Sequence, residues 1–346
     1  IAEIKSALSN GGFSPFLLYG VTGSGKTLVY LRILEEVVRL GKKAIILAPE
    51  IALTPWPAAY LKTLFPGRVA LSHSGLSDGE RMDEWNRVLK GEVDIVVGAR
   101  SALFSPVKEL GLIIVDEEHE TSYKQEDGVR YNARDAALVL GRELGITVVL
   151  GSATPSVETF QNAKTGKIRP LNILNRVDNR SLPEVEVLDM KGHKEVITQR
   201  LMDLLGETLA SKKQAVLFLN RRGFSSCLIC RDCGYSFTCL NCSVTLTLHK
   251  GKRSLICHYC DFTMPAPNEC PSCKGLDLIT PGSGTERVEE EVRRLFPEAR
   301  VGRLDRDTAS LKGAAKRTID EMEEGAIDIL IGTQMVSKGH HFPNVT

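Results

Sequence analysis

The sequence predicts an α/β protein of two parallel-sheet lobes, with a small cysteine-rich module inserted in the second lobe. Three observations predict this class. Short apolar runs alternate with helical periodicity in both halves of the chain, as in parallel sheets that are covered on both faces. The length of 346 residues exceeds one ordinary hydrophobic core. Four Cys-x-x-Cys pairs are confined to residues 230–273, where the alternation stops.

The first lobe is predicted to span residues 1–165 and to begin in β–α order. A helix is expected from Lys26 to Leu40, ending before Gly41, because apolar residues recur there at helical spacing. Apolar runs predict strands at residues 15–19, 43–48, 94–97, 112–115 and 147–150. Residues 166–195 lose this rhythm and are expected to connect the lobes.

The second lobe is predicted to begin at residues 196–225 and to resume at residues 276–346, with the cysteine module at residues 226–275 between its two parts. The predicted elements of this lobe are a strand at 215–219, a helix at 285–296 and strands near 300–304 and 327–331. Because the β–α pattern continues after the cysteines, the module is an insertion and not a tail.

Composition limits the class of protein. The chain has 42% hydrophobic and 25% charged residues, as in soluble globular proteins. No apolar run approaches the roughly 18 residues of a membrane span, and no secretion signal is visible. Eight of nine cysteines have metal-type spacing, which is typical of a reducing compartment. We therefore expect a cytoplasmic protein without a membrane partner. The net charge of +1 neither favours nor excludes nucleic acid.

A phosphate-binding loop of the pattern G-x4-G-K-[ST] lies between the first predicted strand and the helix. Its glycines let backbone N–H groups turn toward phosphates at a helix N-terminus. Lys26 is expected to contact the β- and γ-phosphates, and the Thr27 hydroxyl to bind Mg²⁺. An ordinary Gly-rich turn is the alternative, which the flanking elements disfavour. The predicted ATP-binding residues are Gly20, Val21, Thr22, Gly23, Ser24, Gly25, Lys26 and Thr27.

Acidic residues follow a second predicted strand directly, in the sequence Asp116-Glu-Glu-His119. Carboxyl ends of parallel strands form the edge where α/β sheets bind ligands. Asp116 is expected to hold Mg²⁺ through water, and Glu117 to orient and deprotonate the attacking water. His119 is expected to sense the γ-phosphate. A polar cap on a strand end is the alternative, which the phosphate-binding loop disfavours.

Together with Gly151-Ser-Ala-Thr-Pro155, these motifs resemble the superfamily 2 helicases that carry a D-E-x-H box. Residues 48–55 and 98–104 resemble the strand-contacting motifs of that family, and residues 331–343 its fifth motif. The resemblance implies two RecA-like lobes, ATP and Mg²⁺ as cofactors, and catalytic roles for the motif residues above. It also implies that Ser152, Thr154 and Gly339 couple the nucleotide state to lobe movement.

Residues 218–224, the four Cys-x-x-Cys pairs, and residues 284–286 and 304–308 are similar to the primosomal protein N′ (PriA) family. This resemblance implies an ATP-dependent 3′→5′ DNA helicase that acts at stalled or abandoned replication forks. Its implied partners are forked and single-stranded DNA, primosome proteins and the machinery that loads the replicative helicase. The alternatives are an ATP-binding nucleic-acid scaffold that does not unwind, and an RNA helicase. Intact Lys26, Asp116 and Glu117 disfavour the first, and the cysteine arrangement disfavours the second.

The chain differs from that family's pattern at both ends. It starts 19 residues before Gly20, without the N-terminal DNA-binding region and the glutamine motif, and it ends at Thr346, before the sixth motif with its Arg fingers. An Arg finger contributes about 10³- to 10⁵-fold in rate in related NTPases. We therefore expect the chain as given to be a fragment that binds ATP weakly and hydrolyses it poorly.

Aromatic and basic residues alternate after the D-E-x-H box, in a segment predicted to be a loop. Rings and cations on one loop stack bases and bind phosphates, which would couple DNA binding to Glu117. An ordinary surface loop is the alternative. The candidate DNA contacts are Tyr123, Lys124, Tyr131 and Arg134, with Arg100 and Lys338 from the motifs named above.

The cysteine spacing predicts two structural zinc sites. Residues 243–256 have the pattern of a β-hairpin, with a cysteine pair at each end, which brings four thiolates to one tetrahedral site. The remaining pairs then form the other site, as the resemblance also implies. Four Cys ligands close each site, so the metal is structural. The predicted ligands are Cys230, Cys233, Cys270 and Cys273 for one zinc and Cys239, Cys242, Cys257 and Cys260 for the other.

Cys227 introduces an ambiguity, because it also forms a Cys-x-x-Cys with Cys230. Gly234 follows Cys233, and a tight metal-binding turn favours glycine at that position. We therefore prefer Cys230 with Cys233 and expect Cys227 to be a small buried residue. A disulfide interpretation of the cluster would need export, which nothing in the sequence indicates.

Overall fold

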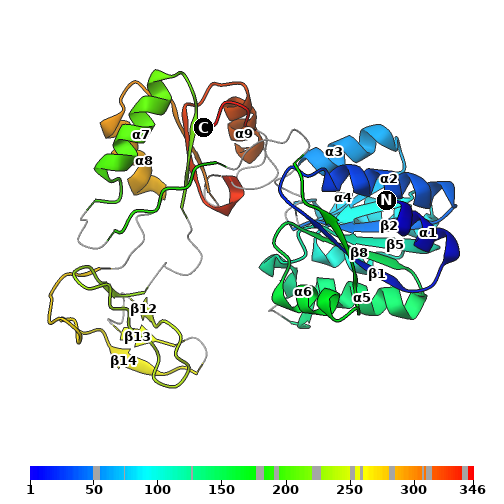
Figure 1. The fold of residues 1–346 in the computed structure, drawn as a ribbon, viewed down its shortest axis with the longest axis horizontal. Helices are drawn as coiled ribbons and strands as arrows, with labels where there is room; N and C mark the ends of the chain where they lie inside the picture. Colours follow the sequence, from blue (N-terminus) through cyan, green and yellow to red (C-terminus); the bar gives the residue numbers. More distant parts are fainter. Residues whose placement is uncertain are drawn as a thin grey trace. The chain divides into compact units, whose positions relative to one another are not determined.

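The structure is a computed structural model, described for residues 1–49, 55–73, 75–125, 128–176, 183–190, 195–219, 227–249, 254–257, 260–279, 285–305, 308, 314–336 and 342–346. It divides into two compact units, Ile1–Glu184 and Val185–Thr346, each of which is taken by itself (Figure 1). Over the described ranges, no helix has the length and apolar character needed to cross a membrane.

Parallel strands form the sheet of the first unit, in the order β3-β4-β2-β5-β8-β1-β9 among the described residues. The strands are β1 (Ser14–Gly20), β2 (Lys43–Leu47), β3 (Val69–Ser72), β4 (Ile95–Gly98), β5 (Leu110–Val115), β8 (Thr147–Ser152) and β9 (Arg169–Ile173). Since β8 pairs with both β1 and β5, the loops that follow these three strands meet at one carboxyl edge. This edge carries the phosphate-binding loop and the D-E-x-H sequence.

Helices cover both faces of this sheet (Figure 1). One face packs against α1 (Ala2–Asn10), α2 (Lys26–Arg39) and α3 (Pro55–Leu64), and the other against α4 (Asp78–Lys90), η1 (Arg100–Phe104), α5 (Ala133–Leu144) and α6 (Val157–Lys164). The segment between β5 and α5 contains η2 (Thr121–Tyr123) and the short antiparallel pair β6 (Lys124–Gln125) and β7 (Tyr131–Asn132). Burial on both faces explains why the strands read as continuous apolar runs.

Strand β9 lies inside residues 166–195, which were predicted to connect the lobes. It pairs with β1 from Phe16↔Arg169 to Gly20↔Ile173, so the sheet of the first lobe extends beyond residue 165. The sequence Arg-Pro-Leu-Asn-Ile is largely exposed and contains Pro170, as an edge strand permits. An edge strand needs no apolar run, which is why the sequence pattern did not reveal it. In this sheet, β3 was not predicted either, and it is the strand at the opposite edge.

The second unit contains a smaller parallel sheet, with the order β10-β17-β16 among the described residues. Its elements are β10 (Ala215–Phe218), β16 (Val301–Leu304), β17 (Ile329–Gly332), α7 (Gln199–Ala210), α8 (Thr285–Leu295), α9 (Ala314–Glu323) and η5 (Gln334–Val336). Helices α7 and α8 contribute to one hydrophobic cluster and α9 to another. Each of these clusters includes residues of β17, so the strand is buried on both faces, as the predicted α/β class requires.

The cysteine module lies between β10 and α8 in the chain and has its own small core. Its strands are β11 (Ile229–Cys230), β12 (Thr247–His249), β13 (Ser254–Ile256), β14 (Thr263–Pro265) and β15 (Leu278–Ile279). The predicted hairpin is β12 with β13, to which β14 adds a third antiparallel strand. The turn predicted at residues 250–252 lies outside the described residues. The predicted insertion in the second lobe is confirmed.

Candidate ATP site and cysteine clusters

The phosphate-binding loop connects β1 to α2 through glycines in the left-handed region, with φ of 77° at Gly23 and 88° at Gly25. Lys26 Nζ donates to the carbonyl oxygen of Gly20 at 2.9 Å. The Ser24 hydroxyl is buried and has no hydrogen-bond partner among the described residues. A side chain at Gly20 would meet it, with a Cβ only 2.5 Å from Ser24 Oγ. The loop thus offers an unpaired hydroxyl and a flexible ammonium group to an anion, which fits a phosphate group.

Asp116 and Glu117 stand at the carboxyl end of β5. The Asp116 N–H donates to the carbonyl of Leu47 at 2.9 Å, and its Oδ1 accepts from the Tyr30 hydroxyl at 2.8 Å. Burial, and next the negative charge of Glu117, raise the pKa of Asp116 to about 6. Glu117 has a positive φ of 46°, which turns the chain sharply after the strand. Two adjacent carboxylates fit a divalent cation, which would favour the ionised form of Asp116.

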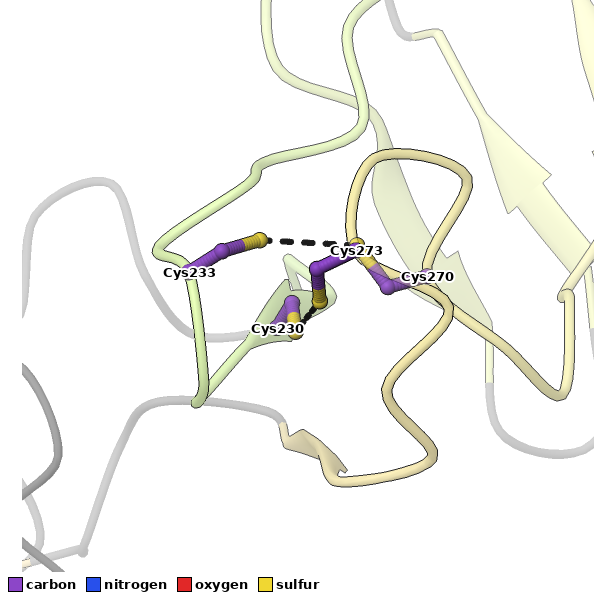
Figure 2. A group of neighbouring side chains, drawn as sticks. All are labelled: Cys230, Cys233, Cys270 and Cys273. Carbon is purple, nitrogen blue, oxygen red and sulfur yellow. Dashed lines mark hydrogen bonds between the residues drawn. The ribbon is translucent and has the colours of Figure 1, made fainter.

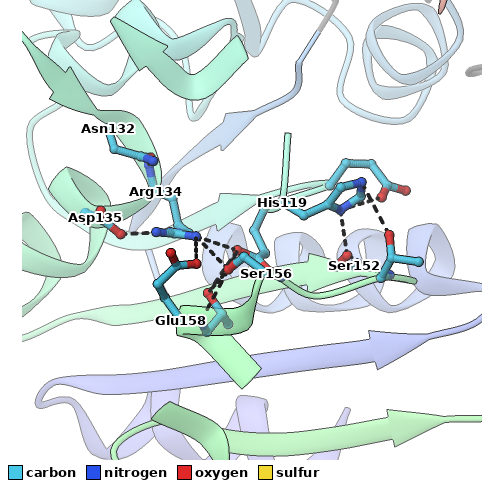
Figure 3. A network of polar contacts seen from close by, with 11 residues as sticks. His119, Asn132, Arg134, Asp135, Ser152, Ser156 and Glu158 are labelled. Carbon is cyan, nitrogen blue, oxygen red and sulfur yellow. Dashed lines mark hydrogen bonds and ion pairs between the residues drawn. The ribbon is translucent and has the colours of Figure 1, made fainter. Parts of the chain in front are cut away.

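His119 joins the D-E-x-H sequence to the end of β8 (Figure 3). Its Nδ1 lies 2.8 Å from Ser152 Oγ, and its Nε2 lies 3.4 Å from Thr154 Oγ1. The same ring is 3.6 Å from a carboxylate oxygen of Glu117. Because β5 and β8 are neighbours, the sheet places the predicted sensor beside two of the predicted coupling residues. The third, Gly339, lies outside the described residues.

Glu118, the variable position of the D-E-x-H sequence, is buried in a polar network at the N-terminus of α6. Its carboxylate accepts from the Ser156 N–H at 2.7 Å, the Ser156 hydroxyl at 3.0 Å and the Thr159 hydroxyl at 2.9 Å. Arg134 Nη1 reaches the same carboxylate at 3.3 Å and the Ser156 hydroxyl oxygen at 2.6 Å (Figure 3). Arg134 also donates to Asp135. This network joins the turn after β5 to α5 and α6.

Two of the predicted DNA contacts are core residues in this structure. Tyr123 is 1% exposed, and its hydroxyl donates to the carbonyls of Leu47 and Asp116 at 3.0 and 2.6 Å. Arg134 is 8% exposed and held in the Glu118 network. Neither side chain is presented to the surface, so the predicted base stacking by Tyr123 and phosphate contact by Arg134 do not fit this geometry. An alternation of rings and cations does not show which of them face the core.

The other predicted DNA contacts have different environments. Arg100, on η1, donates to the carbonyls of Ser122 and Lys124 at 3.2 and 2.8 Å, so its guanidinium braces the segment after η2. Tyr131 is half-buried and meets the exposed ring of Phe104 edge-on, with centroids 5.2 Å apart. Lys124 is exposed. Lys338 lies outside the described residues.

The first cysteine cluster brings together Cys230, Cys233, Cys270 and Cys273 (Figure 2). The Sγ atoms of Cys230 and Cys273 are 3.5 Å apart, and those of Cys233 and Cys270 are 3.6 Å apart. Four thiolates around a zinc ion at about 2.3 Å would lie about 3.8 Å from one another, whereas a disulfide needs about 2.05 Å. The cluster therefore fits a tetrahedral metal site and not a pair of disulfides.

The second cluster contains Cys239, Cys242, Cys257 and Cys260, whose sulfur atoms lie within 4.8 Å of one another. Hydrogen bonding with Cys260 raises the pKa of Cys242 to about 12, whereas the backbone N–H of Phe262 lowers the pKa of Cys260 to about 7. Thiols held this close compete for one negative charge, and a bound cation would allow all four to ionise. The nested arrangement of the pairs predicted from the spacing is the one that the structure has.

All four cysteine pairs adopt the same turn. In each, the residue after the second cysteine has a positive φ and donates its N–H to the carbonyl of the first cysteine, at 2.9 Å. The first cysteine in turn donates its N–H to the carbonyl of the residue that follows the positive-φ residue, at 2.7 to 2.9 Å. The positive-φ residues are Gly234 (76°), Ser243 (54°), Asp261 (57°) and Lys274 (61°). Both sulfur atoms of a pair are thus turned toward one point, which is the geometry a metal ligand pair needs.

Cys227 does not belong to either cluster. It is 3% exposed, and burial raises the pKa of its thiol. The position of Gly234 identified the correct partner of Cys230. Sequence reasoning predicted both groups of four cysteines but missed Tyr30 and Glu118, whose contacts cross between elements. The sequence offered only weak signals for these two residues. Tyr30 is one helical turn after Lys26, and Glu118 lies inside the D-E-x-H sequence, so both are close in the chain to predicted site residues.

The fold and site of the first unit are those of the DEAD/DEAH-box class. A family model described as DEAD/DEAH box helicase matches residues 3–163. The DEAD-box helicase Mss116 bound to ssRNA and UDP-BeF is a similar solved structure, with TM-score 0.58 and 14% identity over 99% of this chain and 61% of that chain. The helicase MrfA bound to DNA and AMPPNP gives TM-score 0.57 and 15% identity over 98% of this chain and 42% of that chain. At these identities, the likeness shows the fold alone.

The particular family follows from the cysteine module and from closer relatives. A family model described as PriA DNA helicase Cys-rich region (CRR) domain matches residues 239–265. The replication restart protein PriA of Bacillus subtilis is 47% identical over 99% of this chain and 43% of its own length, and that of Haemophilus influenzae is 43% identical over 98% and 47%. The chain belongs to the PriA family. It spans about half the length of the curated relatives it matches.

Proposed function

We propose that this chain is the ATP-driven motor core of a replication-restart DNA helicase, which moves 3′→5′ on DNA at stalled or abandoned forks. One observation carries the proposal. Lys26 follows β1, Asp116 and His119 follow β5, and His119 contacts Ser152 at the end of β8, so all three residues lie at a single carboxyl edge. That arrangement joins a phosphate-binding loop to a carboxylate pair and to the residues that end β8. The PriA relatives support the choice of DNA and of replication restart.

The residues at this edge divide the work of ATP hydrolysis. The backbone of residues 20–25 and Lys26 would bind the phosphates, with the ammonium group leaving the Gly20 carbonyl, which holds it at 2.9 Å. Thr27 and Asp116 would hold Mg²⁺, which when bound neutralises charge on the phosphates. Glu117 would accept the proton of the attacking water. His119, bonded to Ser152 and near Thr154, would transmit loss of the γ-phosphate to the end of β8.

The DNA-contacting and zinc-binding parts are also proposals. Lys124 and Tyr131, on β6 and β7, follow Glu117 closely in the chain, so a strand of DNA bound there would act near the water-activating carboxylate. Two Zn²⁺ ions would hold the cysteine module together, because its apolar cluster is small. Primosome proteins and the loading machinery of the replicative helicase are the proposed protein partners, by analogy with the restart role of the relatives.

The test compares ATP hydrolysis by the full-length protein that carries this chain, with forked DNA, single-stranded DNA and RNA. Wild type is expected to hydrolyse ATP fastest with forked DNA and to unwind the fork by moving 3′→5′ along one strand. Lys26→Ala should lose nucleotide binding, whereas Glu117→Gln should bind nucleotide but hydrolyse it at least about 100-fold more slowly. Equal stimulation by RNA would indicate an RNA helicase. Nucleotide binding without hydrolysis by wild type would indicate a scaffold.

A further inference from the structure

We propose that Tyr30 is a positioning residue for the magnesium site: its hydroxyl sets the direction of the Asp116 carboxylate and ties the phosphate-loop helix to β5. The inference rests on the proposed function of the ATP site and deepens it. Tyr30 lies on α2, one turn after Lys26, and is 6% exposed. Its hydroxyl donates to Asp116 Oδ1 at 2.8 Å. No other part of the phosphate-binding pattern provides this contact.

Gly151 makes room for this contact. It is the fifth residue of β8 and is buried between β1 and β5. A Cβ built on Gly151 would lie 1.7 Å from the Tyr30 hydroxyl and 3.5 Å from Asp116 Oδ1. A side chain at this position would therefore displace the phenol from the carboxylate. The glycine before the Ser-Ala-Thr sequence thus has a steric role in the nucleotide site.

A second tyrosine fixes the backbone of the same residue. Tyr123 donates to the Asp116 carbonyl at 2.6 Å and to the Leu47 carbonyl at 3.0 Å. The Asp116 N–H is bonded to that same Leu47 carbonyl at 2.9 Å. With the main chain held on both sides, rotation of the side chain is the freedom that remains, and the Tyr30 hydroxyl restrains it. The direction of the other carboxylate oxygen, Oδ2, is then determined by Tyr30.

If Tyr30 orients Asp116, removing its hydroxyl should weaken nucleotide binding only when binding depends on Mg²⁺. A donor that orients a metal-binding carboxylate changes metal affinity about 10- to 100-fold when it is removed. Tyr30→Phe deletes only the hydroxyl and keeps the buried ring, so the packing of α2 should be retained. We expect this variant to need about tenfold more Mg²⁺ for the same nucleotide affinity. Binding of nucleotide without Mg²⁺, which depends on the loop and Lys26, should not change.

The experiment measures binding of a fluorescent, non-hydrolysable ATP analogue to the full-length protein across a range of Mg²⁺ concentrations and in EDTA. Tyr235→Phe is the matched control, because it makes the same chemical change in the cysteine module, where Tyr235 contacts Phe237 edge-on. Gly151→Ala, whose Cβ would crowd the phenol, should shift the Mg²⁺ dependence in the same direction. ATP hydrolysis across the same Mg²⁺ range should follow the binding curves.

Wild-type Mg²⁺ dependence in Tyr30→Phe would overturn the inference, and so would an equal loss of affinity with and without Mg²⁺, which would mark a structural role. If Tyr30→Phe fails to fold, as judged by thermal unfolding, Gly151→Ala decides the matter by the same criteria. Failure of the proposed function is distinguishable, because wild type would then bind the analogue no better than Lys26→Ala.

Discussion

Replacing Arg134 distinguishes a surface DNA contact from a core residue. In the structure, Arg134 lies at the start of α5, donates to the Ser156 hydroxyl before α6, and is paired with Glu118, whose side chain has no exposure. Arg134→Ala removes the cation and leaves this carboxylate buried. A surface contact, by contrast, could be removed with almost no effect on folding. The two interpretations of the same residue therefore predict opposite results for stability.

The size of the effect follows from the remaining partners of Glu118. Removing one member of a buried ion pair costs about 3 to 5 kcal/mol, because the other charge stays without compensation. Glu118 keeps three donors, from the N–H and hydroxyl of Ser156 and the hydroxyl of Thr159. We therefore expect the lower end, about 3 kcal/mol of unfolding free energy for the first unit. Adding Glu118→Gln should restore part of this loss, because a neutral amide needs no counter-charge.

Urea denaturation followed by tryptophan fluorescence is a suitable assay. Both tryptophans of the chain, Trp56 and Trp85, belong to the first unit, on α3 and α4, so the signal reports on that unit. Arg142→Ala is the control: Arg142 lies on the same helix, its side chain is 70% exposed, and its ion pair within the described part of the chain is with Glu143 at 3.6 Å. That variant should stay within about 0.5 kcal/mol of wild type.

The reasoning is refuted if Arg134→Ala unfolds at the same urea concentration as Arg142→Ala. A variant with wild-type stability but weaker DNA binding would restore the interpretation of Arg134 as a DNA contact. A restored midpoint in the Glu118→Gln double variant supports the pair specifically, because loss of packing alone would not be recovered by changing Glu118.

Three other predictions concern metal, charge and DNA. Cys227→Ala should keep two zinc ions per chain and Cys230→Ala one, measured with a chromogenic chelator after unfolding, since Cys227 lies outside both clusters; equal loss in both variants would contradict the assignment. Asp116→Asn should stabilise the Mg²⁺-free first unit by about 3 kcal/mol at pH 7, because burial raises the pKa of Asp116 from 3.8 to about 6. A protonated Asp116 contributes stability that is complete below pH 3.8 and lost as the pH rises through about 6. The advantage of Asn in urea melts should therefore shrink as the pH falls from 7 to 4, and a constant difference would be evidence against this origin. Lys124→Ala should lower DNA-stimulated ATP hydrolysis severalfold without changing the basal rate; an unchanged stimulation would remove Lys124 from the DNA contacts.

Local patterns were sufficient for the features whose chemistry depends on neighbours in the chain. The phosphate-binding loop, the Asp116–Glu117 pair and the eight clustered cysteines all belong to short segments with fixed spacing, so the sequence identified them directly. The zinc pairing was also accessible, because a hairpin over residues 243–256 leaves one consistent arrangement. The shared turn of the four pairs was not expected at Ser243, Asp261 and Lys274, since a positive φ is usual for glycine only.

The sequence by itself determined the class of fold, the edge that carries the candidate ATP site and the two groups of four cysteines, because apolar periodicity and residue spacing act over a few positions along the chain. Tertiary structure alone decided which side of a segment faces the core. It buried Tyr123 and Arg134, placed Tyr30 against Asp116, and added β9 to the first sheet. These contacts join residues far apart in sequence through strand order and helix packing, and side-chain burial depends on that packing and not on local composition.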